Sequence, residues 1–592
     1  MSRNVAIGIQ SFEQLIENDY FYLDKTAFIR EWWESGDSVT LITRPRRFGK
    51  TLNMSMLEQF FSLDYANRGE LFEGLDIWKE EKYRKLQGTY PVISLSFARV
   101  KEINYEDTRA KLCEILRNLY IKYSFLKDSD VLTDADRAYY DRILAYEVRN
   151  PDITSSLYQM SDFLYRYYGK KVIILLDEYD TPMQEAYVDG YWEELVAFTR
   201  SLFNSAFKTN PWLERGIMTG ITRVSKESIF SDLNNLEVVT TTSDKYATAF
   251  GFTEEEVFAA LEEADLSKEK EKVKQWYDGF IFGEHKDIYN PWSIINFLDK
   301  GKIGTYWAPE DYHLQIAGSR QMSASSHLAR CLRENTSSNS LVGKLLREGN
   351  RRIKEQFETL LGGGSICSPI DEQIVYNQLK GNEAAVWSLL LASGYLKVLA
   401  YEDLPDAASK GRNPEYTLSL TNLEVKLMFQ NMIRDWFTPV EEDYNDFIKA
   451  LLLGDRKAMN VYMNRVALDM FSYFDTGKRP SGEEPERFYH GFVLGLIVGL
   501  QSRYVITSNR ESGFGRYDVV LEPRKPEEDD AIILEFKVHD AEDEETLRDT
   551  VESALAQIKE KQYASALLAK GIPEERIRCY GFAFEGKKVL IG

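Results

Sequence analysis

Short hydrophobic runs and helical stretches alternate along the first 250 residues. The runs 39–43 (VTLIT), 91–97 (PVISLSF) and 171–177 (KVIILLD) are almost wholly apolar, and a weaker run covers 216–224 (GIMTGITRV). Runs of this kind are typical of strands buried on both faces of a parallel sheet. Amphipathic stretches such as LNMSMLEQFF, with apolar residues at helical spacing, lie between them. The alternation predicts an α/β layered domain.

The pattern beyond residue 250 is mainly helical until the last 110 residues. Thr253 and Glu256 form a plausible capping box at the start of the first helix. A Ser/Ala-rich stretch of weak periodicity interrupts the helical pattern, and the turn cluster GKRPSGEEPE marks a linker. We expect four parts: an α/β layered domain (1–250), a helical lid (251–345) with an insertion near 308–334, a helical and winged middle domain (346–478) and a final α/β unit (479–592).

The composition of the 592 residues is that of a globular protein. The apolar fraction is 44%, the aromatic fraction 13%, and 73 Lys and Arg face 94 Asp and Glu, for a net charge of −21. These values exclude a disordered, collagen-like or membrane protein and argue against a general polyanion-coating protein. The four cysteines are far apart and indicate neither a zinc site nor a disulfide framework. We therefore expect a cytoplasmic protein without a membrane partner.

A phosphate-binding loop is predicted where the first strand ends. The segment RPRRFGKT lies between a strand and a helix, so that backbone N–H groups at the helix N-terminus can bind phosphate. Lys50 is expected to reach the β and γ oxygens, and the Thr51 hydroxyl to ligate Mg²⁺. Arg44 stands where the GxxxxGK[ST] pattern has its first glycine. Two alternatives stay open for the arginines of the loop, contact with phosphate or with a partner: Arg44, Arg46 and Arg47.

A second strand end, IILLDEYD, supplies carboxylates for the same chemistry. Asp177 is expected to hold Mg²⁺ through water, and Glu178 to polarise the attacking water. Arg223, just past the run GIMTGIT, is a candidate sensor of the γ-phosphate, with Thr219 and Thr222 as polar neighbours. A surface arginine or one that pairs with a helix is the alternative for Arg223.

The final unit contains a second constellation of charged residues. The segments YDVVL and AIILEFKV are joined by EPRKPEEDD and predict a hairpin in which Asp518 lies opposite Glu535. Glu535 and Lys537 are two positions apart on one strand and point to one face. Two carboxylates can hold a divalent cation, and the lysine can orient or deprotonate a water. The alternative is a salt-bridged surface pair, although charges within an apolar strand are rarely placed there without use.

Further polar residues are expected around this hairpin. They are Glu486, Tyr489 and His490 on a preceding helix, Glu511 and Arg516 before Asp518, and Gln557, Lys561 and Tyr563 on a later helix. For His490 the alternative is a packed face of a helix, and for Gln557 and Tyr563 it is an ordinary helix surface.

Taken together, these motifs resemble a known family. The segments YLDKTAFI, RPRRFGKT, LLDEYDTP, GITRVSKESIFSDLNNL, FGFTEEEV, YDGF and NPWS resemble, in order, the bacterial AAA-ATPase-like family. FYHGF, SNRESGFGRYDVVL, ILEFKV and QIKEKQYA resemble its C-terminal PD-(D/E)xK nuclease domain, with Tyr517 at the place of the signature's proline. The family's YW-x-NTSSN stretch is split here, because the Ser/Ala-rich segment separates Tyr306-Trp307 from residues 335–339.

The resemblance implies a fold and a set of site residues. The fold is multidomain α/β: a P-loop ATPase with a parallel sheet and helices on both faces, a helical lid and middle region, and a C-terminal restriction-endonuclease-like α/β domain. The implied nucleotide site comprises Arg47, Phe48, Gly49, Lys50, Thr51, Asp177, Glu178 and Arg223, with Tyr22, Asp24 and Lys25 at its border. The implied nuclease site comprises Asp518, Glu535 and Lys537, supported by Glu486, Glu511 and Gln557. Metal would be held by Thr51 and Asp177 in the first site and by Asp518 and Glu535 in the second.

The expected function is that of an ATP-binding and ATP-hydrolysing, Mg²⁺-dependent nuclease, with Mn²⁺ as an alternative metal. The ATPase is expected to regulate cleavage of nucleic acid, with DNA favoured, in a role in defence against foreign DNA and with a homo-oligomer open. One alternative is a STAND-like signalling or sensor ATPase whose nuclease-like domain binds nucleic acid or a partner without cutting. Another is a protein that binds ATP only structurally.

Overall fold

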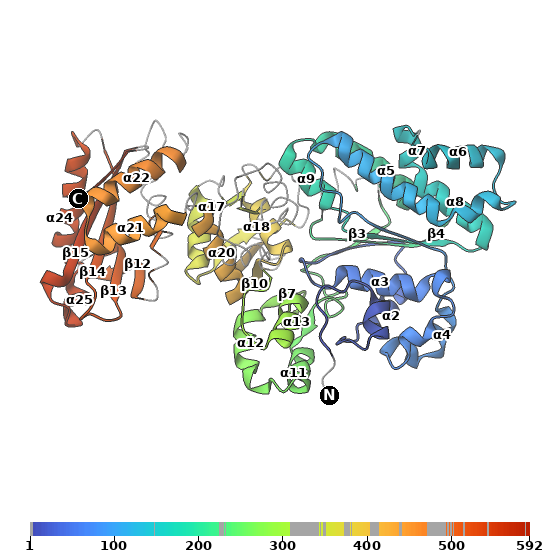
Figure 1. Ribbon diagram of the computed structural model, residues 1–592, viewed down its shortest axis with the longest axis horizontal. Coiled ribbons are helices and arrows are strands. Elements are labelled where there is room, and N and C mark those ends of the chain that lie inside the picture. The colour runs from blue at the N-terminus through green and yellow to red at the C-terminus, as the bar shows by residue number, and fades with distance from the viewer. Residues whose placement is uncertain are drawn as a thin grey trace. The chain divides into compact units, whose positions relative to one another are not determined.

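The computed structural model divides the chain into two compact units (Figure 1). Unit 1 comprises Met1–Gly349 and Gly363–Leu427, and unit 2 comprises Asn350–Gly362 and Met428–Gly592. The described residues are 4–146, 148–223, 230, 233–307, 342–343, 345–346, 351–371, 379, 382–402, 414–436, 441–470, 493, 496–497, 500, 503–512, 515–540, 544–585 and 588–592. Side chains are not described at 433–436, 441–446, 466, 468–470 and 508–518, nor at 351 and 354.

Unit 1 is built on a five-stranded sheet with the order β2-β3-β4-β1-β5 and wholly parallel pairing. Its strands are β1 (Val39–Thr43), β2 (Val92–Ser96), β3 (Val172–Asp177), β4 (Leu213–Gly220) and β5 (Leu236–Val239). All residues of β1 and β3 are buried, as expected for strands covered on both faces. Strand β4 lies between β1 and β3, so the two predicted nucleotide-binding segments leave the same edge from strands that are not neighbours.

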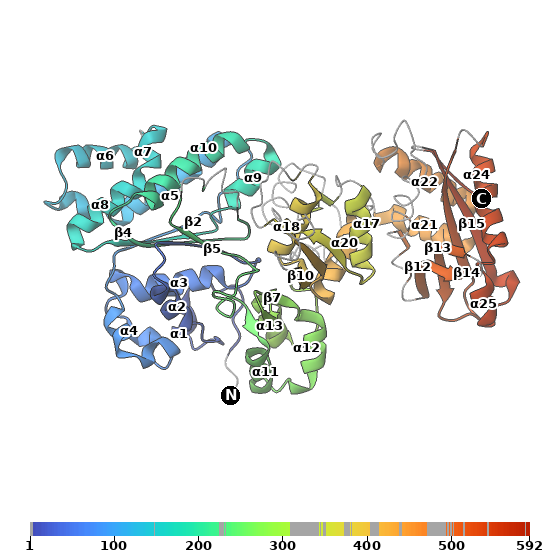
Figure 2. The ribbon, with the colours of Figure 1, turned by 180° about the vertical axis from the view of Figure 1, so that it is seen from behind.

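Helices cover both faces of this sheet (Figures 1 and 2), which confirms the predicted fold class of the ATPase-type domain. On one face lie α1 (Phe12–Glu17), α2 (Ala27–Ser35), α3 (Lys50–Phe61) and α4 (Glu81–Leu86). On the other lie α5 (Tyr105–Lys122), α6 (Asp134–Leu144), α7 (Asn150–Thr154), α8 (Ser156–Tyr168), α9 (Thr181–Asp189) and α10 (Trp192–Phe203). The helices of the first face close a core of aromatic and aliphatic side chains against Ile42, Ile173 and Ile217 of the sheet.

The lid contains strands as well as helices. Its described part contains α11 (Glu254–Glu263), α12 (Lys270–Tyr277), α13 (Pro291–Lys300) and a sheet of β6 (Phe252–Thr253), β8 (His285–Tyr289) and β7 (Phe280–Phe282). The predicted capping box at Thr253 and Glu256 is confirmed. The sequence predicted a helical lid, and the structure adds a small sheet to these helices: Phe280 and Phe282 of β7 are buried at strand spacing, and Gly283, with φ 57°, allows the turn into β8.

Unit 1 ends in a small sheet with a helix. Strands β10 (Leu396–Tyr401), β11 (Glu415–Leu420) and β9 (Ile366–Pro369) pair antiparallel in the order β10-β11-β9, and α18 (Glu383–Ala392) precedes β10. The sequence predicted a β-containing element at this place. Helix α20 (Leu423–Trp436) begins in unit 1 and continues into unit 2.

Unit 2 is a mixed α/β unit with a five-stranded sheet of order β12-β13-β14-β15-β16. The strands are β12 (Tyr504–Ser512), β13 (Gly515–Pro523), β14 (Ala531–Val538), β15 (Ile577–Glu585) and β16 (Lys588–Ile591); β14 and β15 are parallel and the other pairs antiparallel. Besides the second part of α20, its described helices are α17 (Arg351–Leu361), α21 (Glu441–Leu453), α22 (Arg456–Met470), α24 (Leu547–Glu560) and α25 (Ser565–Ala569). This arrangement agrees with the predicted C-terminal α/β fold.

The two faces of β14 are buried by different helices. Ile532, Leu534 and Phe536 belong to one core with residues of α21 and α22, whereas Ile533 belongs to another with Ile558 of α24. Helices α21 and α22 precede residue 479, so residues of the predicted middle segment pack on the C-terminal sheet. By alternation, Glu535 lies on the face of β14 that α24 covers.

Several predictions fall on residues outside the described part. They concern the insertion near 308–334, the linker at 477–486, Glu486, Tyr489 and His490. Among the described cysteines, Cys113, Cys367 and Cys579 are free thiols. None of the described helices is both long and apolar enough to span a membrane.

Candidate functional site

The predicted phosphate loop joins β1 to α3 in a conformation that depends on glycine. Gly49 adopts a left-handed backbone, φ 79°, and is the N-cap of α3. Lys50 is buried, and its ammonium donates hydrogen bonds to the carbonyl oxygens of Arg44 (3.0 Å) and Pro45 (2.9 Å). Burial lowers the pKa of Lys50, although the carboxylates of Glu178 and Asp177 oppose this. The lysine therefore lies across the loop, beside the helix N-terminus that can bind phosphate.

Arg44 stands where the loop pattern has its first glycine, and its guanidinium bonds to backbone carbonyl oxygens of the protein. Its guanidinium is fully buried, donates to the carbonyl oxygens of Thr43 (3.0 Å), Thr240 and Lys245 (3.3 Å), and lies 4.6 Å from the ring centroid of Phe282. Burial lowers the pKa of Arg44 to about 9. Its Nε has no hydrogen-bond partner in the described part. These contacts agree with neither alternative for this arginine, because they tie the loop to β5 and the lid.

Arg47 and Phe48 face the lid. The Arg47 guanidinium donates to the carbonyl oxygen of Tyr306 at 2.9 Å and lies 4.4 Å from the ring centroid of Trp292. Phe48 is buried, with its ring centroid 4.7 Å from that of Phe280. Both residues were predicted to bind nucleotide, and the structure gives their side chains contacts with the lid.

The structure brings Thr51 and Asp177 together. The Thr51 hydroxyl donates to Asp177 Oδ2 at 2.7 Å, and the Thr219 hydroxyl donates to the other carboxylate oxygen. Asp177 is buried, and burial together with the neighbouring charge of Glu178 raises its pKa. A hydroxyl and a carboxylate at hydrogen-bond distance form a donor set that suits Mg²⁺. These residues fit the ion that the sequence predicted here.

Glu178 follows the strand end in a left-handed backbone conformation, with φ 52°. Burial opposes its ionisation, but the charges of Lys50 and Arg46 outweigh this effect and hold the pKa of the carboxyl below its ordinary value. The Thr181 hydroxyl donates to Glu178 Oε2 at 2.8 Å. Left-handed non-glycine residues are often found at active sites. Glu178 is therefore an ionised carboxylate close to Lys50.

Asp180 is a residue of this site that the sequence analysis missed. It is buried, and its Oδ2 accepts hydrogen bonds from the backbone N–H of Ile221 (3.0 Å) and Thr222 (2.9 Å) and from the Thr222 hydroxyl (2.9 Å). Burial raises its pKa. Its place two residues after Glu178 in LLDEYD was a signal that could have been used.

Asp180 thereby fixes the segment that carries Arg223. The Arg223 side chain lines a cavity together with Thr43, Thr240 and Asp371. Asp371 comes two residues after the end of β9. The Arg223 Nε is buried and has no hydrogen-bond partner among the described residues. The role of this arginine in sensing the γ-phosphate stays a prediction.

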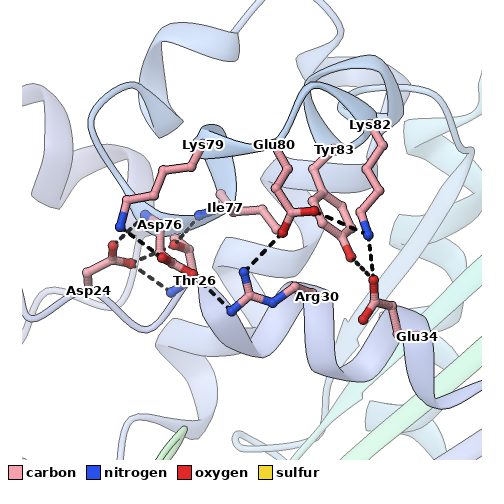
Figure 3. A network of polar contacts seen from close by, with 10 residues as sticks. All are labelled: Asp24, Thr26, Arg30, Glu34, Asp76, Ile77, Lys79, Glu80, Lys82 and Tyr83. Atoms are coloured by element: carbon pink, nitrogen blue, oxygen red, sulfur yellow. Dashed lines mark hydrogen bonds and ion pairs between the residues drawn. The ribbon is translucent and has the colours of Figure 1, made fainter.

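The YLDKT motif connects elements around the nucleotide loop. Figure 3 shows Asp24 pointing toward Thr26 and Asp76: one carboxylate oxygen accepts from the Thr26 backbone and hydroxyl (2.8 and 2.6 Å), the other from the Asp76 backbone (2.7 Å). Lys25 donates to Glu256 of the lid at 2.7 Å and to the carbonyl oxygen of Thr248 at 2.9 Å. Burial lowers the pKa of Lys25. The contacts of Asp24 and Lys25 are thus with other protein groups.

The predicted hairpin of the C-terminal unit has the expected register. Val519 pairs with Leu534, so that Asp518 and Glu535 are the next positions along β13 and β14. Glu535 is only 2% exposed and accepts a hydrogen bond from the Gln557 amide of α24, which also donates to the Tyr563 hydroxyl at 3.2 Å. The side chains of Asp518 and Glu511 lie outside the described part. A buried carboxylate fits a divalent cation.

Lys537 lies two positions beyond Glu535 on the same strand. Its ammonium donates to Ser553 Oγ of α24 at 3.2 Å. The predicted residues Glu535, Lys537 and Gln557 therefore lie between one strand and one helix. Ser553 was missed, although its place four residues before Gln557 puts both on one helical face.

A buried carboxylate also lies where the lid meets α20. Glu424 accepts hydrogen bonds from the Trp307 backbone N–H (2.6 Å) and the Ser293 hydroxyl (2.7 Å). Burial raises its pKa to about 7. Arg47 of the phosphate loop donates to the carbonyl oxygens of Tyr306 and Trp307, directly beside the N–H that Glu424 binds. No sequence pattern marked Glu424, which shows its role only once the lid is folded.

Comparisons with known proteins match two parts of the chain to family models. Residues 6–230 match the family model described as predicted AAA-ATPase, and residues 484–592 match that of the PD-(D/E)XK nuclease superfamily. An uncharacterized protein in the vnfD 5′ region of Azotobacter chroococcum mcd 1 is 23% identical over 586 residues, covering 97% of this chain and 95% of the relative. The ORC2 protein of Aeropyrum pernix, solved in ADPNP–ADP complexes, matches 72% of this chain and 95% of its own at 11% identity with a TM-score of 0.24, too low to carry an argument.

Proposed function

The chain belongs to the predicted AAA-ATPase family over residues 6–230 and to the PD-(D/E)XK nuclease superfamily over residues 484–592, and from this premise we propose its function. We propose that the protein cleaves phosphodiester bonds in nucleic acid, that the cleavage depends on a divalent metal, and that ATP regulates it. The observation that carries it is the buried Glu535 with Lys537 two positions on, both hydrogen-bonded by residues of α24. DNA is the proposed substrate, Mg²⁺ or Mn²⁺ the proposed metal, and defence against foreign DNA the proposed role.

The nucleotide half of the proposal rests on four residues. We assign the binding of phosphate oxygens to Lys50, whose ammonium lies within the loop. We assign Mg²⁺ to Thr51 and Asp177, which are hydrogen-bonded to each other. Bound Mg²⁺ neutralises charge that develops on the phosphates. Glu178 is held ionised by the nearby cations, so it can accept a hydrogen bond from a water and orient it toward the γ-phosphorus.

The nuclease half of the proposal concerns two carboxylates and a lysine on the paired strands β13 and β14. We assign metal binding to Asp518 and Glu535, orientation of a water to Lys537, and support to Glu511 and Gln557. Bound metal lowers the pKa of a coordinated water and stabilises negative charge on the phosphate. Gln557 supports Glu535 in one orientation, because its amide donates a hydrogen bond to one carboxylate oxygen.

We propose that regulation runs through the lid to α20. Arg47 of the phosphate loop and Glu424 of α20 bind neighbouring backbone groups at Tyr306 and Trp307. A nucleotide phosphate that draws Arg47 toward itself would weaken its bond to Tyr306, and the change would reach α20 through Trp307. Helix α20 continues along the chain into unit 2, which contains the nuclease residues.

A cleavage assay on the full chain tests the proposal. Wild type is incubated with single-stranded DNA, double-stranded DNA or RNA and Mg²⁺ or Mn²⁺, with and without ATP, beside Lys50→Ala, Lys537→Ala and the exposed control Glu527→Ala. We expect wild type and the control to cut DNA, Lys537→Ala to cut none, and Lys50→Ala to lose the response to ATP.

Two outcomes contradict the proposal. DNA cleavage by Lys537→Ala at the wild-type rate would contradict the assignment of the nuclease site. Wild-type protein that binds nucleic acid but cuts no substrate with either metal favours the sensor function instead.

A further inference from the structure

Helix α24 makes a series of side-chain hydrogen bonds to the face of β14 that carries Glu535 and Lys537, and to His539 just after this strand. Strand residues at spacing two lie on one face, and helix residues at spacing three or four do the same. Glu535, Lys537 and His539 are hydrogen-bonded to Gln557, Ser553 and Thr550, respectively. The strand and helix run antiparallel in this pairing, because the residue numbers rise on one while they fall on the other. Two of the three helix residues, Ser553 and Thr550, were not among the predicted site residues.

The contact with Ser553 matters because of the nature of a lysine side chain. The ammonium stands at the end of four flexible carbons, and holding it in one place costs conformational entropy. Lys537 is only partly buried, so packing alone leaves its end group free to move. Ser553 Oγ at 3.2 Å accepts one of the three ammonium hydrogens and leaves two for a water or a phosphate oxygen.

The neighbouring pairs keep Ser553 in place. Thr550 is buried, and its Oγ1 lies 3.0 Å from His539 Nδ1 and bonds to Glu544. Gln557, one turn further along, bonds to Glu535. Ser553 lies between these two anchors on a helix whose Val551, Ala554 and Ile558 are buried. The backbone at Ser553 is therefore fixed, and its hydroxyl is available to fix the lysine.

We propose that Ser553 is a positioning residue, which holds the Lys537 ammonium in the orientation that phosphodiester cleavage requires. The inference deepens the proposed nuclease function and rests on it. Ser553 acts through Lys537 and does not touch the substrate. Misplacement of a reacting group by about 1 Å can lower a rate on the order of 100-fold. Loss of the hydroxyl is therefore expected to lower the rate of the chemical step while leaving substrate binding unchanged.

The test compares Ser553→Ala with Ser553→Thr, which restores a hydroxyl at the same carbon, and with the exposed control Glu552→Ala. Steady-state cleavage of a DNA duplex in Mg²⁺ is measured on the full chain. We expect Ser553→Ala to lower kcat on the order of 10- to 100-fold with KM unchanged, and Ser553→Thr and Glu552→Ala to stay within about threefold of wild type.

A second measurement probes the Lys537 ammonium without DNA cleavage and without metal. The accessible amines are labelled with a limiting amount of an acetylating reagent, and the labelled fraction of Lys537 is determined by peptide mass spectrometry. We expect the labelling rate of Lys537 to rise at least about twofold in Ser553→Ala and to return toward wild type in Ser553→Thr, because a hydrogen-bonded ammonium is less free to react.

The outcomes separate this inference from the proposed function. Wild-type cleavage with unchanged kcat in Ser553→Ala, or a kcat loss that Ser553→Thr does not restore, overturns the role of Ser553 alone. Unchanged labelling of Lys537 in Ser553→Ala also overturns it. Wild-type protein that cuts none of the substrates overturns the proposed function, and the positioning role with it.

Discussion

The two candidate sites both combine a buried carboxylate at a strand with a lysine, but they are assembled differently. In the nucleotide site, Thr51 and Asp177 are bonded across 126 positions of sequence, and Thr219 and Asp177 across 42. In the C-terminal site, Gln557 and Glu535 are 22 positions apart, and Lys537 and Ser553 only 16. The first site requires a complete parallel sheet. The second is largely contained in one strand and the helix that follows it.

This difference predicts how each site responds to change. Contacts between distant segments form only with the whole domain, so damage anywhere in the sheet reaches the nucleotide site. The strand and helix of the C-terminal site pack on each other through their own apolar residues, Ile533 and Ile558. Substitutions in unit 1 should therefore change ATP binding and turnover while leaving ATP-independent DNA cleavage as it is.

The largest expected effect is that of Asp177→Asn on ATP turnover. Asparagine keeps the shape and can still accept from Thr219, but it lacks the charge that binds Mg²⁺. We expect turnover to fall on the order of 100- to 1,000-fold, with binding of an ATP analogue within about tenfold of wild type. ADP release and titration of a fluorescent analogue measure the two quantities. Turnover at the wild-type rate would remove Asp177 from the proposed site.

Glu424→Gln should change the pH dependence of stability. Folding raises the pKa of Glu424 from 4.5 to about 7, so the folded protein takes up a proton between these values. Wild-type stability is therefore expected to fall as pH rises through this window, by up to about 3 kcal/mol at 1.4 kcal/mol per pKa unit. Glutamine can bond to both Trp307 and Ser293 but does not titrate.

Urea unfolding of both proteins at pH 5, 6, 7 and 8 measures this difference, with the exposed Glu255→Gln as the control. The free energy of unfolding of Glu424→Gln should lack the fall with rising pH that wild type and the control share. Parallel stability curves for wild type and Glu424→Gln would contradict the prediction, and DNA cleavage without ATP should be unaffected in either case.

Gly220→Ala tests the close contact at the end of β4. A Cβ at this position would lie 2.6 Å from Asp180 Oδ1 and 2.7 Å from a ring carbon of Tyr179. Overpacking of this kind costs about 1 to 3 kcal/mol, and it shifts the carboxylate that fixes the segment before Arg223. We expect lower stability and weaker ATP binding, measured by urea unfolding and analogue titration.

The matched control is Gly362→Ala, where the nearest atoms are 3.4 and 3.5 Å away. Its stability should stay within about 1 kcal/mol of wild type. Equal stability of the two alanine variants would show that the β4 end adapts to the added methyl group.

The smallest expected effect is that of Lys25→Met, which removes the link from the YLDKT motif to the lid. The Lys25 side chain is 10% exposed and bonds to Glu256 and Thr248, so its loss is expected to cost about 1 to 2 kcal/mol. Lys85→Met is the control, because the Lys85–Glu81 pair is 75% and 70% exposed and should contribute less than about 0.5 kcal/mol. Differential scanning calorimetry of both variants tests the ranking.

The features predictable from sequence were those set by local patterns. The limits of β1, the capping box at Thr253 and the register of Val519 with Leu534 follow from apolar runs, one motif and one turn. The loop function of Arg44 did not follow, because its guanidinium binds carbonyl oxygens near residues 240 and 245, which approach it only when β5 pairs with β1.

The same reason explains why Glu424 and Asp180 were missed. Each binds a backbone N–H group, which every sequence position offers, and a hydroxyl group from a distant segment, so spacing along the chain does not mark the partner. Ser553 is different. Its partner is a side chain on the preceding strand, and the helical spacing from Gln557 would have been enough to place it beside Lys537.

The chain passes three times between the two units, at Gly349 and Asn350, at Gly362 and Gly363, and at Leu427 and Met428. One consequence concerns exchange of the nuclease module between relatives. A single crossover cannot transfer unit 2, because α17 lies in the sequence between two parts of unit 1 and the last passage falls inside α20. A chimera cut at residue 428 leaves α17 with the original ATPase part. Recombination that keeps unit 2 intact must therefore carry Arg351–Leu361 as a separate insert.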